Sequence, residues 1–210
     1  KTFKKSDYFS ATALFREDLA NVENYGGNIS ENQGNLILRY SKKWKKFLIL
    51  PVLRLEYYEN YQEQAIKSIS LVRKYKNWTF RYNVEDKFRI PTFNDRYWRN
   101  SGNPDLQPEK GWGTDLNASW FKEYKKSCLY LQSNIYWISL DNWIQWIPSE
   151  NGLFIPTSYQ KVASKGATIN IKYSMTIRKV QLDFDYKETF VNARILDNYA
   201  DNENLIGKQL

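Results

Sequence analysis

The chain has 210 residues and a formal net charge of +8, from 31 Lys and Arg against 23 Asp and Glu, with no His and one Cys. The single thiol, Cys128, excludes an internal disulfide framework and a cysteine-based zinc site, and the lack of His excludes His-based triads from this chain. The longest clearly apolar run, from Phe47 to Leu53, is far shorter than the roughly 18 residues that suggest a transmembrane helix.

The strongest pattern along the chain is an alternation of apolar and polar residues. It is unbroken over Thr168–Met175 and again over Val180–Lys187. A period of two places apolar side chains on one face of a strand, and 17 % aromatic residues favour strands further. We expect an all-β antiparallel fold. The nine expected strands cover residues 8–19, 34–43, 46–58, 67–75, 77–97, 109–124, 127–147, 155–176 and 180–195.

Pro51 lies inside the third expected strand and predicts a bulge or kink there, because proline has no N–H for the strand ladder. The connections between strands are expected to alternate in length. The short ones lie near residues 41–46, 75–77, 124–127 and 176–179. The long, polar ones lie near residues 20–33, 59–66, 98–108, 148–154 and 192–207. Short turns at one end and long loops at the other are typical of an outer-membrane β-barrel.

The basic residues are concentrated at the short turns. Twelve of the 31 lie there: Lys42, Lys43, Lys45, Lys46, Arg73, Lys74, Lys76, Lys122, Lys125, Lys126, Arg178 and Lys179. The long loops instead lean acidic. A basic rim beside aromatic residues indicates contact with lipid headgroups, although lysine in a turn also discourages aggregation. Nucleic-acid binding would need a basic groove with aromatic residues for stacking, so we predict no nucleic-acid partner.

One segment, residues 88–110, carries a recognisable motif and is called the signature segment below. It reads Phe-Arg-Ile-Pro-Thr-Phe-Asn-Asp-Arg-Tyr-Trp from Phe88, and Gly-Asn-Pro-Asp-Leu-Gln-Pro-Glu-Lys from Gly102. It resembles the barrel signature of TonB-dependent outer-membrane receptors, in which an F-R-x-P-T-x-x-D-L-Y strand end leads into G-N-P-x-L-x-P-E. The departure is Arg96, where the family usually has Leu.

The motif residues are predicted to be structural anchors rather than ligand contacts. They are Phe88, Arg89, Pro91, Thr92, Asp95, Gly102, Asn103, Pro104, Leu106, Pro108 and Glu109. Proline suits places where strand pairing ends, and Gly-Asn-Pro is turn chemistry. Arg89, Asp95 and Glu109 are predicted to form ion pairs where the strands separate. Residues 135–146, 159–166 and 207–210 are also similar to family segments, and residues 1–76 agree with the family in strand pattern.

The resemblance implies a 22-stranded transmembrane barrel closed by an N-terminal plug, so residues 1–210 are expected to be part of the barrel domain, without the plug or the final strands. It implies a Gram-negative outer-membrane receptor that takes up a metal-siderophore, cobalamin or haem. The implied partners are outer-membrane lipid, the TonB complex through the plug, the ligand and a surface lipoprotein. No cofactor, metal site or enzymatic activity is implied.

Four loop aromatic residues are the candidate ligand contacts: Tyr97, Trp98, Trp143 and Trp146. Their alternative role is in an aromatic girdle at the membrane surface. Two other classes of protein remain open. A soluble carbohydrate-binding β-sandwich would use the same aromatic residues as stacking platforms. An enzyme would rest on a carboxylate pair such as Asp183 and Asp185, which otherwise reads as a pair of solvated residues.

Overall fold

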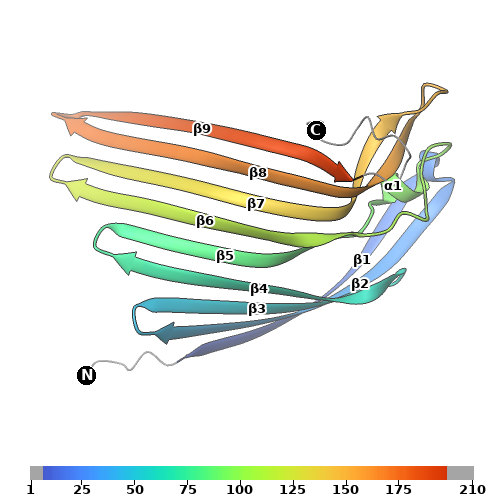
Figure 1. Ribbon diagram of the computed structural model, residues 1–210, viewed down its shortest axis with the longest axis horizontal. Coiled ribbons are helices and arrows are strands. Elements are labelled where there is room, and N and C mark those ends of the chain that lie inside the picture. Colours follow the sequence, from blue (N-terminus) through green and yellow to red (C-terminus); the bar gives the residue numbers. More distant parts are fainter. Residues whose placement is uncertain (1–6, 198–210) are drawn as a thin grey trace.

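The computed structural model describes residues 7–197, which form one antiparallel sheet with its strands in chain order (Figure 1). The elements are β1 (Tyr8–Val22), η1 (Glu23–Tyr25), β2 (Gly27–Trp44), β3 (Phe47–Tyr58), β4 (Tyr61–Tyr75), β5 (Trp78–Arg89), α1 (Phe93–Tyr97), β6 (Glu109–Tyr124), β7 (Ser127–Pro148), β8 (Phe154–Ile177) and β9 (Val180–Asp197). The expected all-β antiparallel class is confirmed. Within this range no helix is both long and apolar enough to cross a membrane.

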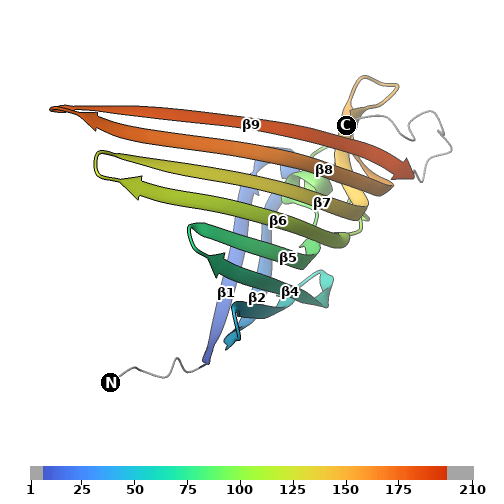
Figure 2. The ribbon, with the colours of Figure 1, turned by 60° about the vertical axis from the view of Figure 1, so that its left-hand side comes forward.

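The sheet is a single curved wall, and its strand direction turns progressively from β9 to β1 (Figure 2). No second sheet packs on it in the described range, so the β-sandwich alternative is wrong. Among residues 7–197 the wall is open, with β1 and β9 each paired on one side only.

Strand register gives the wall two chemically different faces. Leu131 of β7, Ile171 of β8 and Tyr186 of β9 are direct neighbours across the ladders, and so are Gln132, Asn170 and Lys187 one position along. Because side chains alternate, the first three share one face and the second three share the other. We call these the apolar face and the polar face. Further residues of the apolar face are Phe9, Phe15, Leu36, Leu38, Leu53, Leu55, Ile69, Leu71, Phe80, Tyr82, Leu116, Ile135 and Phe184.

The four expected short turns are present at one end of the wall, and each has two residues (Figure 1). They are residues 45–46, 76–77, 125–126 and 178–179. Lys45, Lys76 and Arg178 have φ of 53°, 52° and 56°. Two-residue hairpin turns commonly need positive φ because it matches the twist of the flanking strands.

Two of the expected long loops are instead strand. The predicted loop over 20–33 is wrong: β1 and β2 pair as far as Val22 and Gly27, and only η1 and Gly26 separate them. The predicted loop over 59–66 is also wrong, since β4 begins at Tyr61. Polar residues in these segments bond across the strands, as Gln33 does to Asp18 (2.7 Å). Their polarity therefore marks strand beyond the apolar band rather than loop.

The loops expected over 98–108 and 148–154 are confirmed, with strand reaching Pro148 and resuming at Phe154. The strand expected over 77–97 ends at Arg89, and α1 follows, because Thr92 and Asp95 form a capping box that starts a helix. The loop expected over 192–207 is wrong up to Asp197, where β9 ends, and its remainder lies outside the described residues.

Pro51 produces no bulge. It pairs with Ile69 of β4, while the ladder to β2 lapses between Arg39–Val52 and Lys42–Ile49 and resumes in the same register. The register shift of β3 lies between Glu56 and Tyr58 instead. The lack of an N–H at Pro51 therefore interrupts the pairing of β3 with β2 but leaves the register of the two strands unchanged.

Candidate functional site

The signature segment folds back over the end of the wall opposite the short turns. The Thr92 backbone N–H donates to Asp95 Oδ2 (2.8 Å), and the Asp95 N–H donates to Thr92 Oγ1 (3.2 Å), which fixes the first turn of α1. Asp95 also accepts a hydrogen bond from Trp146 Nε1 of β7 (2.8 Å). One carboxylate thus joins the helix start to a strand 51 residues away in sequence.

A second carboxylate joins β5, β6 and β7. Glu109, 4 % exposed, accepts from Arg89 Nε (2.8 Å) and from the Ile144 backbone N–H (2.9 Å). Arg89 Nη1 lies 3.7 Å from Asp95. The ion pairs predicted among Arg89, Asp95 and Glu109 are therefore present. Their charge-assisted bonds hold the strand ends where ladder pairing stops.

The Gly-Asn-Pro turn is shaped by close backbone approach. A Cβ at Gly102 would lie 2.6 Å from Trp98 N and 2.7 Å from Arg96 O, so only glycine fits there. The Asn103 N–H donates to the carbonyl of Asp95 (2.8 Å), and the Asn103 side chain accepts from the N–H of Asp105 (3.0 Å). Pro91 and Leu106 are buried.

Arg96, the departure from the family motif, forms a buried ion pair with Glu31 of β2. Arg96 Nη2 donates to Glu31 Oε2 (2.6 Å), and the two side chains are 3 % and 5 % exposed. Rings of Tyr61, Phe93 and Tyr97 lie 4.8–5.5 Å from the guanidinium carbon. Burial opposes the charge of Glu31, but hydrogen bonds from Arg96 and Asn60 outweigh it, so the pKa of Glu31 lies below its ordinary value.

This pair ties the β1–β2 hairpin to α1, as do the hydrogen bond from Arg99 N to Asn24 O (2.7 Å) and the edge contact of Tyr25 with Trp98 (6.3 Å). The sequence did not point to Glu31, Asn60 or Tyr61 as partners, since residues 20–33 and 59–66 were expected to be loops. Arg96 itself could have indicated that a carboxylate partner lies nearby, because a charged residue in place of Leu needs a partner when buried.

The four candidate ligand aromatics do not form one site. Tyr97 lies on α1 beside Arg96, and Trp98 is 38 % exposed against Tyr25. Trp146 bonds to Asp95, while Trp143 packs against Val162 and Ile195. Their role as ligand contacts stays a prediction. Trp98 is exposed, whereas Tyr97, Trp143 and Trp146 are half-buried.

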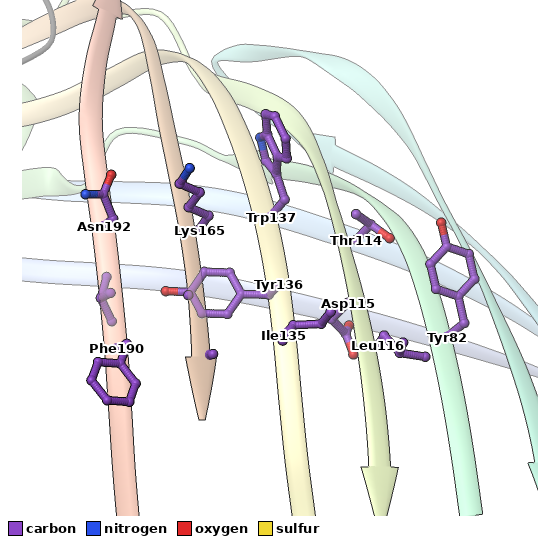
Figure 3. A pocket seen from close by; sticks show the side chains of 13 residues that line it. Tyr82, Thr114, Asp115, Leu116, Ile135, Tyr136, Trp137, Lys165, Phe190 and Asn192 are labelled. Carbon is purple, nitrogen blue, oxygen red and sulfur yellow. The ribbon is translucent and has the colours of Figure 1, made fainter. Parts of the chain in front are cut away.

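One pocket, of about 690 Å³, lies away from the signature segment. It is a shallow depression lined mainly by apolar-face residues such as Ile135, Trp137 and Phe190 (Figure 3). A second pocket, of about 550 Å³ and polar, lies between the β3–β4 turn, α1 and residues 104–110. Asp183 and Asp185 lie on the polar face, where Asp185 pairs with Lys172 (2.9 Å). The described residues contain no group of three His, Cys, Asp or Glu able to hold a metal ion.

Comparison with known proteins agrees with this geometry. The family model described as TonB dependent receptor-like, beta-barrel, matches residues 3–210. The chain belongs to the TonB-dependent receptor β-barrel family.

Two curated relatives in this family are named vitamin B12 transporter BtuB. The protein from Vibrio vulnificus is 24 % identical over 121 residues, which cover 54 % of this chain and 19 % of the relative. The protein from Photobacterium profundum is 27 % identical over 108 residues, covering 50 % and 17 %. The match therefore spans about a fifth of the length of these relatives.

Solved structures share the fold. The siderophore receptor PirA of Pseudomonas aeruginosa superposes with a TM-score of 0.66 at 12 % identity, over 89 % of this chain and 38 % of that one. The FrpB iron transporter of Neisseria meningitidis gives a TM-score of 0.66 at 10 % identity, over 99 % and 36 %. The wall of nine strands thus corresponds to part of a receptor barrel.

Proposed function

We propose that this chain is part of an outer-membrane receptor of a Gram-negative bacterium that takes up a bulky nutrient by TonB-dependent transport. In this proposal residues 1–210 form part of the barrel domain, and the TonB complex acts through a plug domain encoded elsewhere in the protein. Cobalamin and metal-siderophores are the first ligands to consider, because the relatives named above are a vitamin B12 transporter and a siderophore receptor.

The observation that carries the proposal is the division of the wall into an apolar and a polar face. On β7, β8 and β9 the alternation continues over more than the 9–11 residues or so that cross a bilayer. Side chains of the apolar face such as Phe184 and Ile135 are more than half exposed. A water-soluble protein would cover them, whereas a barrel presents them to lipid and its polar face to the lumen.

The long strands also fit transport at a membrane. β8 has 24 residues and β7 has 22, so both extend well beyond the bilayer. In this proposal the end of the wall opposite the short turns is the outer mouth of the barrel, and Tyr97, Trp98 and the polar pocket lie there. We infer that ligand is first bound there.

The test uses the full-length protein in its own host or a Gram-negative strain lacking its cobalamin receptor. We expect it in the outer-membrane fraction, with uptake of labelled cyanocobalamin or of a ferric siderophore that stops when TonB is deleted. Uptake that continues without TonB, or recovery of the protein in the periplasm, would contradict the proposal. The outer-membrane porins of the same strain serve as the fractionation control.

A further inference from the structure

The polar pocket at the loop end occupies a gap in the wall. Pairing between β4 and β5 begins only at Ser68 and Glu85, so residues 61–67 of β4 have no ladder partner on β5. Residues 104–108 of the signature loop and the first residues of β4 line the same open pocket of about 550 Å³. The pocket is therefore built by the divergence of two strands and not by a loose loop.

The lining of this pocket is rich in neutral carboxamides. Its amide side chains are Asn60, Gln62, Gln64 and Gln107. Tyr61 and Tyr97 add phenols, and Leu106 adds hydrocarbon at the base. A carboxamide offers both donors and acceptors and carries no charge.

The charges around the pocket cancel. Arg96 lines it but is neutralised by the buried Glu31. Lys110 lies over the ring of Phe88 (5.9 Å), and Asp105 supplies one opposite charge. The pocket consequently presents hydrogen-bonding groups without a net field that would select an anion or a cation.

Several polar groups of the lining lack a partner within the described residues. The internal bonds of the amides are Asn60 Nδ2 to Glu31, Gln64 Nε2 to the Gln62 carbonyl (3.0 Å) and Gln107 Nε2 to the Asp105 carbonyl (3.3 Å). These leave the Gln62 side-chain amide and the Gln64 and Gln107 amide oxygens available. Arg96 Nε is buried without a hydrogen-bond partner. Gln62 and Gln107 are exposed and Gln64 is half-buried, so water pairs their free amide groups until a ligand with complementary donors and acceptors replaces it. The buried Arg96 Nε is the one costly unpaired group among these lining atoms.

We propose that this pocket binds carboxamide or hydroxyl groups on the periphery of a neutral nutrient, and so selects a corrinoid-like ligand over an anionic ferric chelate. The inference rests on the proposed function and names the ligand class of its loop-end site. Gln62 and Gln64 on β4 and Gln107 on the loop are the specificity-determining residues. Each neutral hydrogen bond is worth roughly a three- to tenfold change in affinity.

The test measures binding of cyanocobalamin and of a ferric tris-catecholate to the purified full-length receptor in detergent. We expect the unchanged protein to bind cyanocobalamin more tightly, and Q62L/Q64L to weaken that binding about tenfold or more. The matched control is Q132L/Q181L, which changes two glutamines on the polar face near the short turns and should leave the affinity unchanged. Heat-modifiable electrophoretic mobility checks that each variant is folded.

Gln107→Leu provides a second route, because this exposed loop residue takes part in no strand pairing, and we expect it to weaken cyanocobalamin binding three- to tenfold. Equal cyanocobalamin affinity in Q62L/Q64L, Gln107→Leu and the control would overturn the inference. So would tight binding of the ferric chelate that neither variant alters, although that result leaves the proposed uptake function standing. Failure of TonB-dependent uptake for every nutrient would instead remove the function itself.

Discussion

At the scale of single residues, Arg96 shows how one departure from a family motif reorganises its surroundings. The side chain is buried, so its charge needs a counter-ion, and Glu31 supplies one from a strand 65 residues earlier. The aromatic rings around it add cation–π attraction, which a guanidinium makes well because it is planar and weakly hydrated. The pair therefore joins the β1–β2 hairpin to α1, and we call these joined segments the loop base.

Replacing Arg96 by Leu should release this loop base. Glu31 would be left as an unpaired buried carboxylate, at a cost of about 3–5 kcal/mol. We expect amide hydrogen exchange over residues 93–106 to accelerate strongly in the full-length protein. The double variant E31L/R96L removes both charges and should recover much of the protection. If the single variant exchanges no faster than the unchanged protein, the pair does not hold the loop.

Gly166 is a second residue whose identity is set by packing. It lies opposite Tyr136 on the polar face, and the Tyr136 ring reaches from β7 across β8 (Figure 3). A Cβ at Gly166 would lie 2.5 Å from the carbonyl oxygen of Phe190 and 2.6 Å from Tyr136 Cε1. Backbone cannot yield as a flexible side chain does, so the β7–β8–β9 junction depends on this glycine.

Gly166→Ala should therefore destabilise the barrel by about 1–3 kcal/mol, the usual cost of overpacking. The matched control is Gly34→Ala, where a Cβ would make only an ordinary contact of 3.7 Å with Tyr57 Cβ. The measurement is the urea or heat midpoint of unfolding of the full-length protein in detergent. Equal midpoints for the two variants would show that the junction accommodates the methyl group.

At the scale of elements, the alternation of apolar and polar residues predicted the strands, whereas segments without that alternation were missed. All nine strands were found, because apolar residues recur every second position where the wall has an apolar face. The extensions of β1, β2 and β4 were missed, because both faces of these strands are largely polar beyond the apolar band and the period of two disappears. α1 was missed because five residues are too few for a helical period, and only the Thr92–Asp95 capping box reveals it.

The basic residues at the short turns were located from the sequence. Lys42, Arg73 and Lys122 lie on the apolar face, level with Trp44, Tyr75 and Trp120. Arg73 lies over the ring of Phe47 (5.6 Å) and Lys122 over that of Tyr124 (4.9 Å). Neither Arg73 nor Lys122 has an ion-pair partner among the residues that the structure describes, and Lys42 lies 4.0 Å from Asp7 in an exposed pair that is weak in water. Their counter-charge is therefore expected from outside the chain, at the depth of lipid phosphates.

Neutralising these three cations should weaken the preference for anionic lipid. Basic residues near a membrane surface contribute about 1 kcal/mol each, so K42Q/R73Q/K122Q should lose on the order of 100-fold in preference for phosphatidylglycerol over phosphatidylcholine vesicles. The control K43Q/K74Q/R81Q removes three charges from the polar face instead. The readout is insertion of the refolded full-length protein into each vesicle type. An identical loss in both variants would mean that net charge acts, and not the outward cations.

At the scale of the whole molecule, the nine described strands form an open sheet. Within residues 7–197 the outer edges of β1 and β9 have no strand partner, and their N–H and C=O groups and the exposed apolar face are features that a barrel would cover with further strands and lipid. Both needs are met if the wall is one sector of a closed barrel, which agrees with its coverage of 38 % of the PirA chain. In a closed barrel the apolar face would then contact lipid and the polar face would contact the aqueous lumen.

Labelling of single cysteines along β8 and β9 tests this directly. In full-length protein carrying C128S, cysteines at Ile169, Ile171, Phe184 and Tyr186 should react with a lipid-soluble maleimide. Cysteines at Thr168, Asn170, Asp183 and Asp185 should react with a small water-soluble one, because these residues alternate between the two faces. The same eight variants in urea should all react with the soluble reagent, which controls for thiol reactivity. Labelling without a period of two in the membrane would contradict the barrel sector, because every strand pairing in the wall fixes that alternation.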